Sequence, residues 1–404
     1  MLAAIAAALI GGVILNLMPC VFPVISLKAL SLLRHGDSPA AARKDGAAFA
    51  AGVVATMLLL AGVLIAARAG GAAIGWGFQL QSPVVIAVLA LVMLGSALNL
   101  AGLFEVGASV QGVAGGIQVK SGPMGSALTG ALAIVVATPC TAPFMAGAVG
   151  YALVQPPLVA LAVFLALAIG FAAPFTLIAF VPALARMMPK PGAWMETLKK
   201  ALAFPMFGAA AWLAWVLAQQ AGTDALAGLF ISAVVLSLAC WLYGMAQRRR
   251  LMGQKSVALF AVTAALGALL IVPVVHLAGA APVAAKAPKG SETIAWSPQA
   301  IAEHQGKGRP ILVNFTASWC ITCQVNERTT LSTPAVKAAL ERTGSLYMIA
   351  DSTNYNPDIE NALAALGRGG MPVYVVYPAD GGAPKLLPEV LSPDIVITAL
   401  NEAS

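Results

Sequence analysis

The chain has 404 residues, of which 60% are hydrophobic and only 10% are charged, and its mean hydropathy is +0.87. This composition excludes an ordinary water-soluble globular protein for most of the length and predicts a membrane protein. The formal net charge of +7 would suit a nucleic-acid-binding protein, so the positions of the basic residues have to decide that question.

Apolar stretches long enough to cross a bilayer recur through the first two thirds of the chain. A hydrocarbon core of about 30 Å needs roughly 20 helical residues. We predict eight spans, at residues 2–33, 47–67, 84–104, 124–154, 158–180, 201–221, 225–245 and 257–277. The first has no Lys or Arg before Lys28, whereas a signal peptide begins with a basic region, so we interpret it as a span. Residues 1–278 are therefore predicted to form a polytopic all-α membrane domain of about eight helices.

The basic residues lie in alternate loops. Only Arg68 follows the second, fourth or sixth span. Twelve basic residues follow the first, third, fifth and seventh spans: Arg34, Arg43, Lys44, Lys120, Arg186, Lys190, Lys199, Lys200, Arg248, Arg249, Arg250 and Lys255. Because Lys and Arg accumulate in cytoplasmic loops, these loops should be cytoplasmic and both chain ends should lie outside. The positive charge is then a feature of topology, and nucleic acid is not an expected partner.

A cysteine between two prolines interrupts the first span. In LNLMPCVFPVISLKAL, residues 15–30, Pro19 and Pro23 flank Cys20. Each proline removes a backbone donor and clashes with the preceding turn, so the helix should be broken near mid-membrane. Unpaired carbonyls at that depth are tolerated only against protein or water, which predicts a cavity around Cys20. Taken alone, the thiol is more simply interpreted as a small buried hydrophobe beside a proline kink.

The same pattern returns in the fourth span. VVATPCTAPFMAGAV, residues 135–149, places Cys140 between Pro139 and Pro143, 120 residues after the first cysteine. Because the first copy lies in the first span and the second in the fourth, the repeated unit should contain three helices. Three is odd, so the two units should be inverted relative to one another. Matched thiols in inverted units favour a central pair that forms and breaks a disulfide accessible from either side. Cys240, without flanking prolines or a counterpart, is interpreted as structural.

A soluble region follows the last span. AGAAPVAAKAPKG, residues 278–290, is rich in Ala, Pro and Lys, and we assign residues 279–290 to a linker and 291–404 to a soluble domain. Apolar strand patterns alternate with helical patterns in this domain, which predicts a small α/β fold with a central sheet. The predicted strands include residues 345–353 and 371–378, and the predicted helices are residues 356–366 and 392–403.

A Cys-x-x-Cys pair follows an apolar strand of this domain. RPILVNFTASWCITC, residues 309–323, places Cys320 and Cys323 at an expected helix N-terminus. The helix dipole and free amides there favour the Cys320 thiolate, and Cys323, one turn further, is placed to attack a mixed disulfide at Cys320. A structural metal would need further ligands, but there is no second cysteine pair and the three histidines have no ligand spacing.

Two more residues are candidates for supporting the dithiol. Pro372 opens a strand after GRGGM and is a candidate cis proline beside the dithiol; the alternative is an ordinary trans proline at a sheet edge. Glu327, four residues after Cys323, should share a helical face with the cysteines; the alternative is a solvated helix charge.

These motifs resemble known families. The soluble domain resembles thioredoxin through Trp319-Cys320-Ile321-Thr322-Cys323 and the pair Met371-Pro372. The whole chain resembles the DsbD family of transmembrane thiol:disulfide interchange proteins, close to its ScsB and CcdA relatives. The segments that carry this resemblance are NLMPCVFPVISLK, GWGFQLQSP, ATPCTAPF and SWCITCQVNE.

The resemblance implies a function in redox transfer. Cys20 and Cys140 correspond to the family's membrane pair, Cys320 and Cys323 to its periplasmic thioredoxin-like dithiol, and Glu327 to an acidic residue that tunes the dithiol. Cytoplasmic thioredoxin would supply electrons, which pass through the bacterial inner membrane to the outer domain and then to periplasmic disulfide proteins, such as those of cytochrome c maturation. The chain would be a protein-disulfide reductase that needs no cofactor.

Three features depart from the family. The family's separate N-terminal periplasmic domain is absent from this sequence, which leaves the final acceptor undetermined. Asn314 occupies the position of a buried Asp that thioredoxins use in proton transfer, and Gln324 follows the second cysteine where Lys is common.

Alternatives remain open from the sequence. Gln79 and Gln81, at the outer end of the second loop, could line the transfer path or simply end the third span. Cys20 and Cys140 could be Cu(I) ligands of a soft-metal transporter with a metal-chaperone domain. The membrane region could also be an inert anchor for a thioredoxin-like module.

Overall fold

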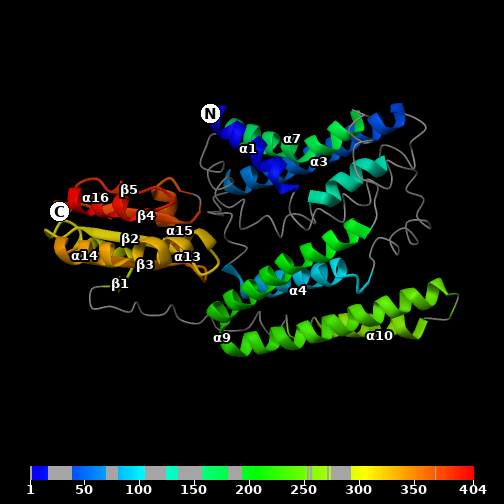
Figure 1. Ribbon diagram of the computed structural model, residues 1–404. Helices are drawn as coiled ribbons and strands as arrows, with labels where there is room; N and C mark the ends of the chain where they lie inside the picture. The colour runs from blue at the N-terminus through cyan, green and yellow to red at the C-terminus, as the bar shows by residue number, and fades with distance from the viewer. Residues whose placement is uncertain are drawn as a thin grey trace.

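The computed structural model describes residues 2–16, 39–69, 81–104, 124–134, 157–180, 193–252, 254, 257–270, 273, 293–368 and 370–404. Within them, apolar helices are followed by a small α/β domain (Figure 1). This confirms the predicted class of a helical membrane region joined to a C-terminal α/β domain.

The described part of the membrane region is helical. Each of the eight predicted spans coincides at least in part with one of its helices. These are α1 (Leu2–Leu15), α3 (Pro39–Ala69), α4 (Pro83–Leu100), a helix at Met124–Ile134, α7 (Pro157–Phe180), α9 (Ala193–Leu251) and α10 (Val257–Leu269). Among the described residues, four helical segments are long and apolar enough to cross a membrane: Arg43–Val63, Pro83–Leu100, Leu158–Leu177 and Glu196–Arg250.

Helix α9 consists of two helices that meet at Gly222. The φ of 83° and ψ of −173° at this residue are not helical, and glycine adopts positive φ without the steric penalty of a Cβ atom. The break falls between the sixth and seventh predicted spans, residues 201–221 and 225–245. One continuous element in the structure therefore corresponds to two predicted spans.

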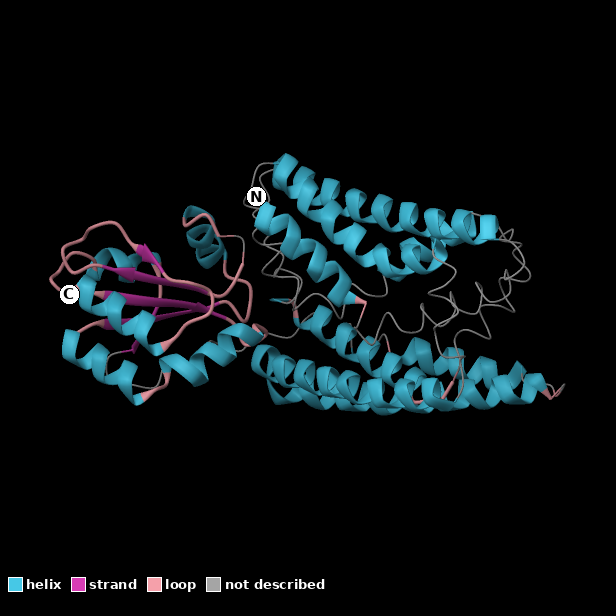
Figure 2. Ribbon diagram, turned by 45° about the horizontal axis from the view of Figure 1, so that its top comes forward, coloured by secondary structure: helices cyan, strands magenta, loops and turns pink. Residues whose placement is uncertain are grey.

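The membrane helices form two groups (Figures 1 and 2). In the first, α1, α3, α7 and Met124–Ile134 share a buried hydrophobic cluster, in which the rings of Phe49 and Phe175 lie 5.0 Å apart. In the second, α4 packs along α9 and buries Ile86 against residues that include Leu217.

Two helix crossings in the first group are equivalent. A Cβ atom on Gly12 of α1 would lie 2.4 Å from the carbonyl oxygen of Leu167, and one on Gly170 of α7 would lie 2.2 Å from that of Leu9. A Cβ on Gly130 would likewise lie 2.5 Å from the oxygen of Phe49, and one on Gly52 of α3 would lie 2.1 Å from that of Ala127. These close approaches require glycine at all four positions.

The sequence positions of these crossings repeat. Gly130 follows Gly12, and Gly170 follows Gly52, by the same 118 residues (130 − 12 and 170 − 52). In every case the facing carbonyl belongs to the residue three positions before the partner glycine. The first helix of each predicted unit thus crosses the second helix of the other unit in the same way, which supports the predicted internal repeat.

The third helices of the two units run in opposite directions. The start of α4 lies beside the α/β domain, as the hydrogen bond from Gln81, two residues before the helix, to Ser352 of that domain shows. The first half of α9 ends beside the same domain, as the hydrogen bond from Gln220 to Thr353 shows. Opposite directions for equivalent helices support the predicted inversion of the repeat.

The α/β domain is built on a sheet with strand order β1-β3-β2-β4-β5 among residues 293–368 and 370–404 (Figure 1). β2 (Ile311–Thr316) is central, and five of its six residues are buried. The other strands are β1 (Thr293–Ala295), β3 (Leu346–Asp351), β4 (Val373–Tyr377) and β5 (Lys385–Leu386). β1 and β2 pair with β3 in parallel, whereas β4 pairs antiparallel with β2 and β5.

Helices cover both faces of the sheet. Successive side chains of a strand point to opposite faces, so Ile311, Val313 and Phe315 contribute to one core and Leu312 to the other. The first core includes residues of α12 (Pro298–His304) and α15 (Pro357–Ala365), and the second includes residues of α14 (Pro334–Thr343) and α16 (Pro393–Ala403). α15 and α16 confirm the predicted helices 356–366 and 392–403, and each begins with proline after a capping side chain, Asn356 or Ser392.

Candidate functional site

The predicted membrane centre lies outside the described residues. It consists of Cys20, Cys140 and their flanking prolines, Pro19, Pro23, Pro139 and Pro143. Gln79 also lies outside the described residues. The described site is consequently the dithiol of the α/β domain. Cys240, in the second half of α9, is a partly buried free thiol.

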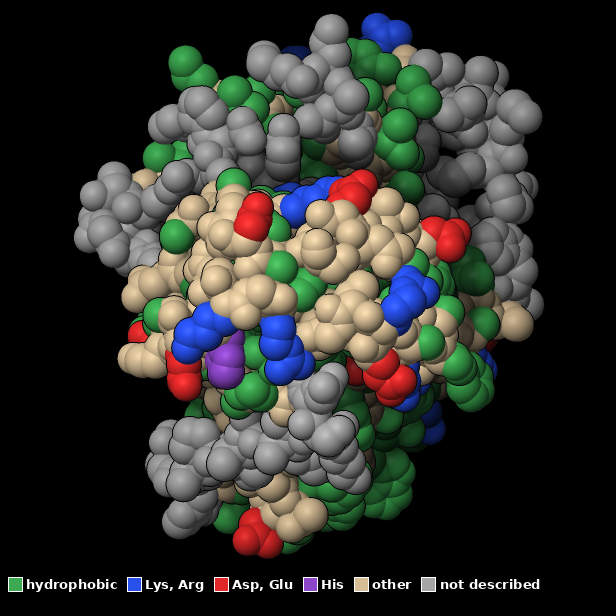
Figure 3. Space-filling model, turned by 90° about the vertical axis from the view of Figure 1, so that its left-hand side faces the viewer, with side chains coloured by type: hydrophobic (Ala, Val, Ile, Leu, Met, Phe, Trp, Pro, Cys, Tyr) green, Lys and Arg blue, Asp and Glu red, His purple; other side chains and the backbone are tan. Residues whose placement is uncertain are grey.

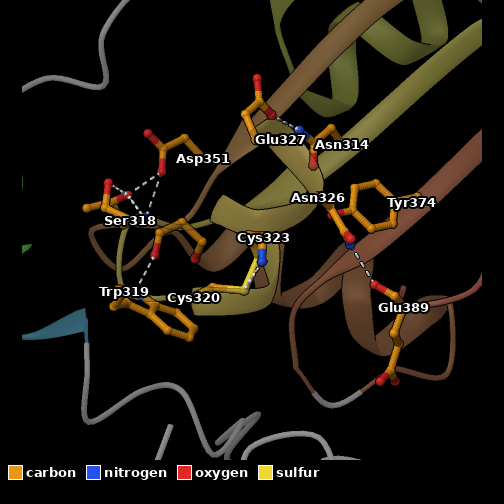
Figure 4. Close-up of a disulfide and its surroundings, with 12 residues drawn as sticks. Asn314, Ser318, Trp319, Cys320, Cys323, Asn326, Glu327, Asp351, Tyr374 and Glu389 are labelled. Atoms are coloured by element: carbon orange, nitrogen blue, oxygen red, sulfur yellow. Dashed lines mark hydrogen bonds between the residues drawn. A yellow bond between two sulfur atoms is a disulfide. The ribbon is translucent and has the colours of Figure 1, made fainter. Parts of the chain in front are cut away.

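Cys320 and Cys323 are joined by a disulfide at the N-terminus of helix α13 (Ile321–Asn326), as shown in Figure 4. Cys320 is the N-cap residue, and its Sγ accepts a hydrogen bond from the Cys323 amide at 3.1 Å. An amide donor and the positive end of the helix dipole both stabilise a sulfur that carries negative charge. Cys320 is 7% exposed and Cys323 only 1%, so Cys320 is the more accessible of the two cysteines.

The loop that carries the disulfide is tied to the end of strand β3. The Trp319 Nε1 donates to the Ser352 carbonyl at 3.3 Å, and the Ser318 amide donates to Thr353 Oγ1 at 2.9 Å. Thr353 is itself fixed, because its Oγ1 donates to Asp351 Oδ1 at 2.5 Å. The sequence predicted Trp319 as part of the site but not this supporting segment, because Ser and Thr after a strand are common in ordinary turns.

The peptide bond between Met371 and Pro372 is cis, which confirms the prediction. Val373, the next residue, pairs with Phe315 near the end of β2. The sheet register therefore places Pro372 beside the start of the loop that carries the disulfide.

Glu327 forms a polar group with Asn314 and Tyr347. The Asn314 Nδ2 donates to Glu327 Oε2 at 3.3 Å and to the Tyr347 hydroxyl at 2.8 Å, and Figure 4 shows Glu327 and Asn314 pointing toward one another. Glu327 is partly buried at the start of the π-helical turn η2 (Glu327–Leu331). The solvated-charge alternative does not fit this environment.

Burial is the main cause of the electrostatic shifts in this group. It raises the pKa of the Glu327 carboxyl, and the hydrogen bond from Asn314 and the charge of Lys337 only partly oppose it. Burial also raises the pKa of Tyr347 well above its ordinary range, so this phenol is neutral. Asn314, which replaces the usual thioredoxin Asp, thus holds a carboxyl supplied by Glu327.

Asn326 is a structural residue that the sequence did not single out. It is 1% exposed, and its Nδ2 donates to the Tyr374 hydroxyl at 3.0 Å and to the Glu389 carbonyl at 2.7 Å (Figure 4). Its Oδ1 accepts from the Leu391 amide at 3.3 Å. Asn326 thereby ties α13, and with it the disulfide, to β4 and to the segment before α16.

Gln81 makes contacts that neither expected alternative included. It does lie at the edge of the third span, but its side chain bonds to Ser352 and Glu360 of the α/β domain. Gln220, which the sequence did not single out, makes a similar contact. Among the described residues, no three His, Cys, Asp or Glu side chains come close enough to form a metal-binding group.

Two family models match the chain. Residues 1–218 match the transmembrane model described as cytochrome C biogenesis protein transmembrane domain, and residues 292–379 match a thioredoxin-like domain. Together with the apolar helices, the first match identifies a multi-pass membrane protein.

Curated relatives are named thiol:disulfide interchange protein DsbD. The chain is 27% identical to those of Ralstonia nicotianae and Vibrio cholerae, with 94% and 92% of this chain and 65% and 62% of the relatives covered. It is 29% identical to DsbD 2 of Pseudomonas aeruginosa, with 82% of this chain and 58% of that protein covered. The chain thus spans less than two thirds of the length of these relatives. Because the transmembrane model matches more than half of the chain, this protein belongs to the DsbD family of cytochrome c biogenesis transmembrane proteins.

Proposed function

We propose that this protein is a protein-disulfide reductase that carries reducing equivalents across the bacterial inner membrane by successive thiol-disulfide exchanges. The observation that carries this proposal is the Cys320–Cys323 disulfide at a helix N-terminus, in a domain that contacts the helices of a DsbD-type membrane region. In the proposed division, residues 1–278 are the membrane electron-transfer domain, 279–290 the linker and 291–404 the outer domain.

The proposed donor is reduced cytoplasmic thioredoxin. Its thiolate attacks a disulfide between Cys20 and Cys140, which forms a mixed disulfide and releases one membrane thiolate. The second thioredoxin thiol then attacks the mixed disulfide. Thioredoxin leaves oxidised, and the membrane pair holds the two electrons and, after proton uptake, two protons.

The second exchange reduces the outer domain. A membrane thiolate attacks Cys320 Sγ, the bond to Cys323 breaks, and Cys323 leaves as a thiolate that takes up a proton. The other membrane thiol then displaces Cys320, which restores the membrane disulfide. Glu327, one turn after Cys323, is the proposed source of the proton, because its raised pKa keeps a carboxyl proton available at higher pH than usual.

No cofactor is required by this scheme, because cysteine pairs carry the electrons throughout. Two electrons move with two protons, so the transfer carries no net charge and avoids a field cost of about 2.3 kcal/mol per charge per 100 mV. Direction follows from redox potential, since about 30 mV is equivalent to about 1.4 kcal/mol in a two-electron step. The proposed acceptors are periplasmic disulfide proteins, and both chain ends would lie in the periplasm.

Mixed-disulfide trapping tests the proposal. In Cys323→Ala no second thiol of this domain can displace an acceptor bound to Cys320, so complexes with the acceptor should accumulate in cells. A thioredoxin variant without its second cysteine attacks the Cys20–Cys140 disulfide of the parent but cannot resolve the mixed disulfide, so this complex should accumulate; it should not form in Cys140→Ala, which has no membrane disulfide to attack. Cys240→Ala is the matched control and should behave as the parent does. Recovery of no mixed disulfide from either trapping variant would contradict the relay.

A further inference from the structure

Two glutamine side chains of the membrane region bind the outer domain. Gln81 Nε2, just before α4, donates to Glu360 Oε1 at 2.8 Å and to Ser352 Oγ at 3.3 Å. Gln220 Nε2, just before the Gly222 turn, donates to the Thr353 carbonyl at 2.9 Å. Asn354 Nδ2 approaches the Gln220 carbonyl in return, at 3.5 Å. The contacts therefore come from the start of α4 and from the end of the first half of α9, both of which face the outer domain.

The contacts are closed to solvent. Gln220 and Ser352 are 0% exposed, Gln81 4% and Thr353 6%. A buried amide N–H is costly unless it is hydrogen-bonded, so the bonds from Nε2 of Gln81 and Gln220 favour the docked arrangement over any in which these partners are lost without replacement. When the domains separate, water can hydrogen-bond to a neutral carboxamide, which makes such contacts suitable for reversible docking.

The segment that these glutamines bind also supports the disulfide. Trp319 bonds to the carbonyl of Ser352, and the Ser318 amide to the hydroxyl of Thr353. Cys320 and Trp319 belong to the same buried hydrophobic cluster as Ile86 of α4. The active end of the outer domain thus faces the membrane helices, whereas the opposite end is polar and carries side chains of both charges (Figure 3).

We propose that Gln81 and Gln220 form a reversible latch that holds the outer domain with its disulfide against the membrane region. They are positioning residues for the exchange between the membrane and outer cysteines, and this consequence rests on the proposed function. With Cys320 only 7% exposed, a water-soluble protein cannot approach its sulfur along the S–S axis while the latch is closed. The docked state receives electrons, and release of the latch allows delivery to a soluble acceptor.

The first test measures docking without the relay. The oxidised full-length protein, in nanodiscs, carries Cys20→Ala and Cys140→Ala, and the probe is the water-soluble phosphine TCEP, which reduces an accessible Cys320–Cys323 disulfide. Gln220→Ala should raise the reduction rate about fivefold, the factor expected for one lost hydrogen bond. Gln219→Ala, the neighbouring carboxamide, is the matched control and should leave the rate unchanged.

A charge exchange separates docking from a general structural defect. Gln81→Glu places a second carboxylate beside Glu360 and should raise the TCEP rate at least as much as Gln220→Ala does. Adding Glu360→Gln restores a donor and an acceptor with their roles reversed, and the rate should return to within about twofold of the parent. Because the double variant retains Glu at position 81, its rescue shows that this change is compatible with the fold and that its effect depends on the charge at position 360.

The second measurement follows thioredoxin-driven reduction of the outer disulfide in the chain with all its cysteines. It should slow in Gln81→Glu and recover in the exchanged pair. Parent-like TCEP rates in Gln81→Glu and Gln220→Ala, or no recovery on exchange, would overturn the latch. Shifted TCEP rates with no thioredoxin-driven reduction in any variant, the parent included, would support the latch and refute the proposed function.

Discussion

Asn314 and Glu327 show how a side-chain substitution can be accommodated within one site. An amide at position 314 cannot take up a proton, but it donates a hydrogen bond to the partly buried carboxyl of Glu327. The carboxyl therefore comes from the turn after α13 and not from strand β2. With this arrangement a carboxyl group is still available for proton transfer near Cys323.

The raised pKa of Glu327 predicts a pH-dependent stability. A carboxyl whose folded pKa lies above its unfolded pKa contributes most to stability below the unfolded value, and this contribution is lost as pH rises through the folded value. Glu327→Gln removes the ionisable group and with it this pH-dependent loss of stability. The thermal unfolding midpoint of the variant should rise relative to the parent as pH increases from the ordinary Glu pKa upward.

The comparison should be made on the oxidised full-length protein in detergent, across a pH series. Glu303→Gln, on the short helix α12, is a control for the loss of one exposed carboxylate, and its difference from the parent should not vary in the same way. A Glu327→Gln difference that is constant with pH would mean that this carboxyl titrates normally.

Sequence patterns located the reactive residues of the outer domain better than their supports. Trp319, Cys320 and Cys323 belong to a compact motif with its own chemistry, and Pro372 to a separate Met-Pro pair; the structure brings them to one end of the sheet. Ser352, Thr353 and Asn326 could not be distinguished from ordinary turn and helix residues, because their roles depend on partners distant in sequence. One feature of the sequence marks Gln220, because with Gln219 it forms a polar pair within an apolar span.

At the scale of helices, the two glycine crossings predict sharply localised sensitivity. A methyl group on Gly52 of α3 would lie 2.1 Å from the backbone oxygen of Ala127, so the helices must separate to accept it. Gly52→Ala should destabilise the membrane region by about 1–3 kcal/mol, as expected for overpacking. The thermal unfolding midpoint in detergent measures this effect.

Gly62 of the same helix provides the control. A Cβ atom there would meet nothing within 4 Å, and alanine has the higher helix propensity, so Gly62→Ala should leave stability unchanged or slightly higher. Equal losses at Gly52 and Gly62 would contradict the close crossing. Gly130→Ala should resemble Gly52→Ala, because the two residues face each other's helices.

Hydropathy predicted where the helices lie, because a bilayer requires long apolar segments. It could not predict how they pair, since an apolar surface suits either lipid or another helix. The crossings depend on single glycines, and α9 joins two spans through Gly222 without an intervening loop of irregular structure. The repeat was predictable from its cysteine motifs, although the glycines show its geometry in the described residues.

For the whole molecule, the ends of the helices agree with the predicted topology. The start of α1 and the start of α4 lie toward the outer domain, as does the Gly222 turn, whereas the end of α9 with Arg248, Arg249 and Arg250 lies at the far end (Figure 1). The basic end of α9 and the thioredoxin-like domain are thus at opposite ends of the described membrane helices. This is the arrangement that a relay from cytoplasm to periplasm requires.

The most direct test of the relay is the redox state of the outer dithiol when only the cytoplasmic face receives electrons. The full-length protein is reconstituted in sealed vesicles, reduced thioredoxin is supplied to that face, and Cys320 and Cys323 are followed by alkylation and mass. The parent and Cys240→Ala should become reduced, whereas Cys20→Ala and Cys140→Ala should remain oxidised. Reduction of the outer disulfide at the parent rate in either of these last two variants would contradict the account.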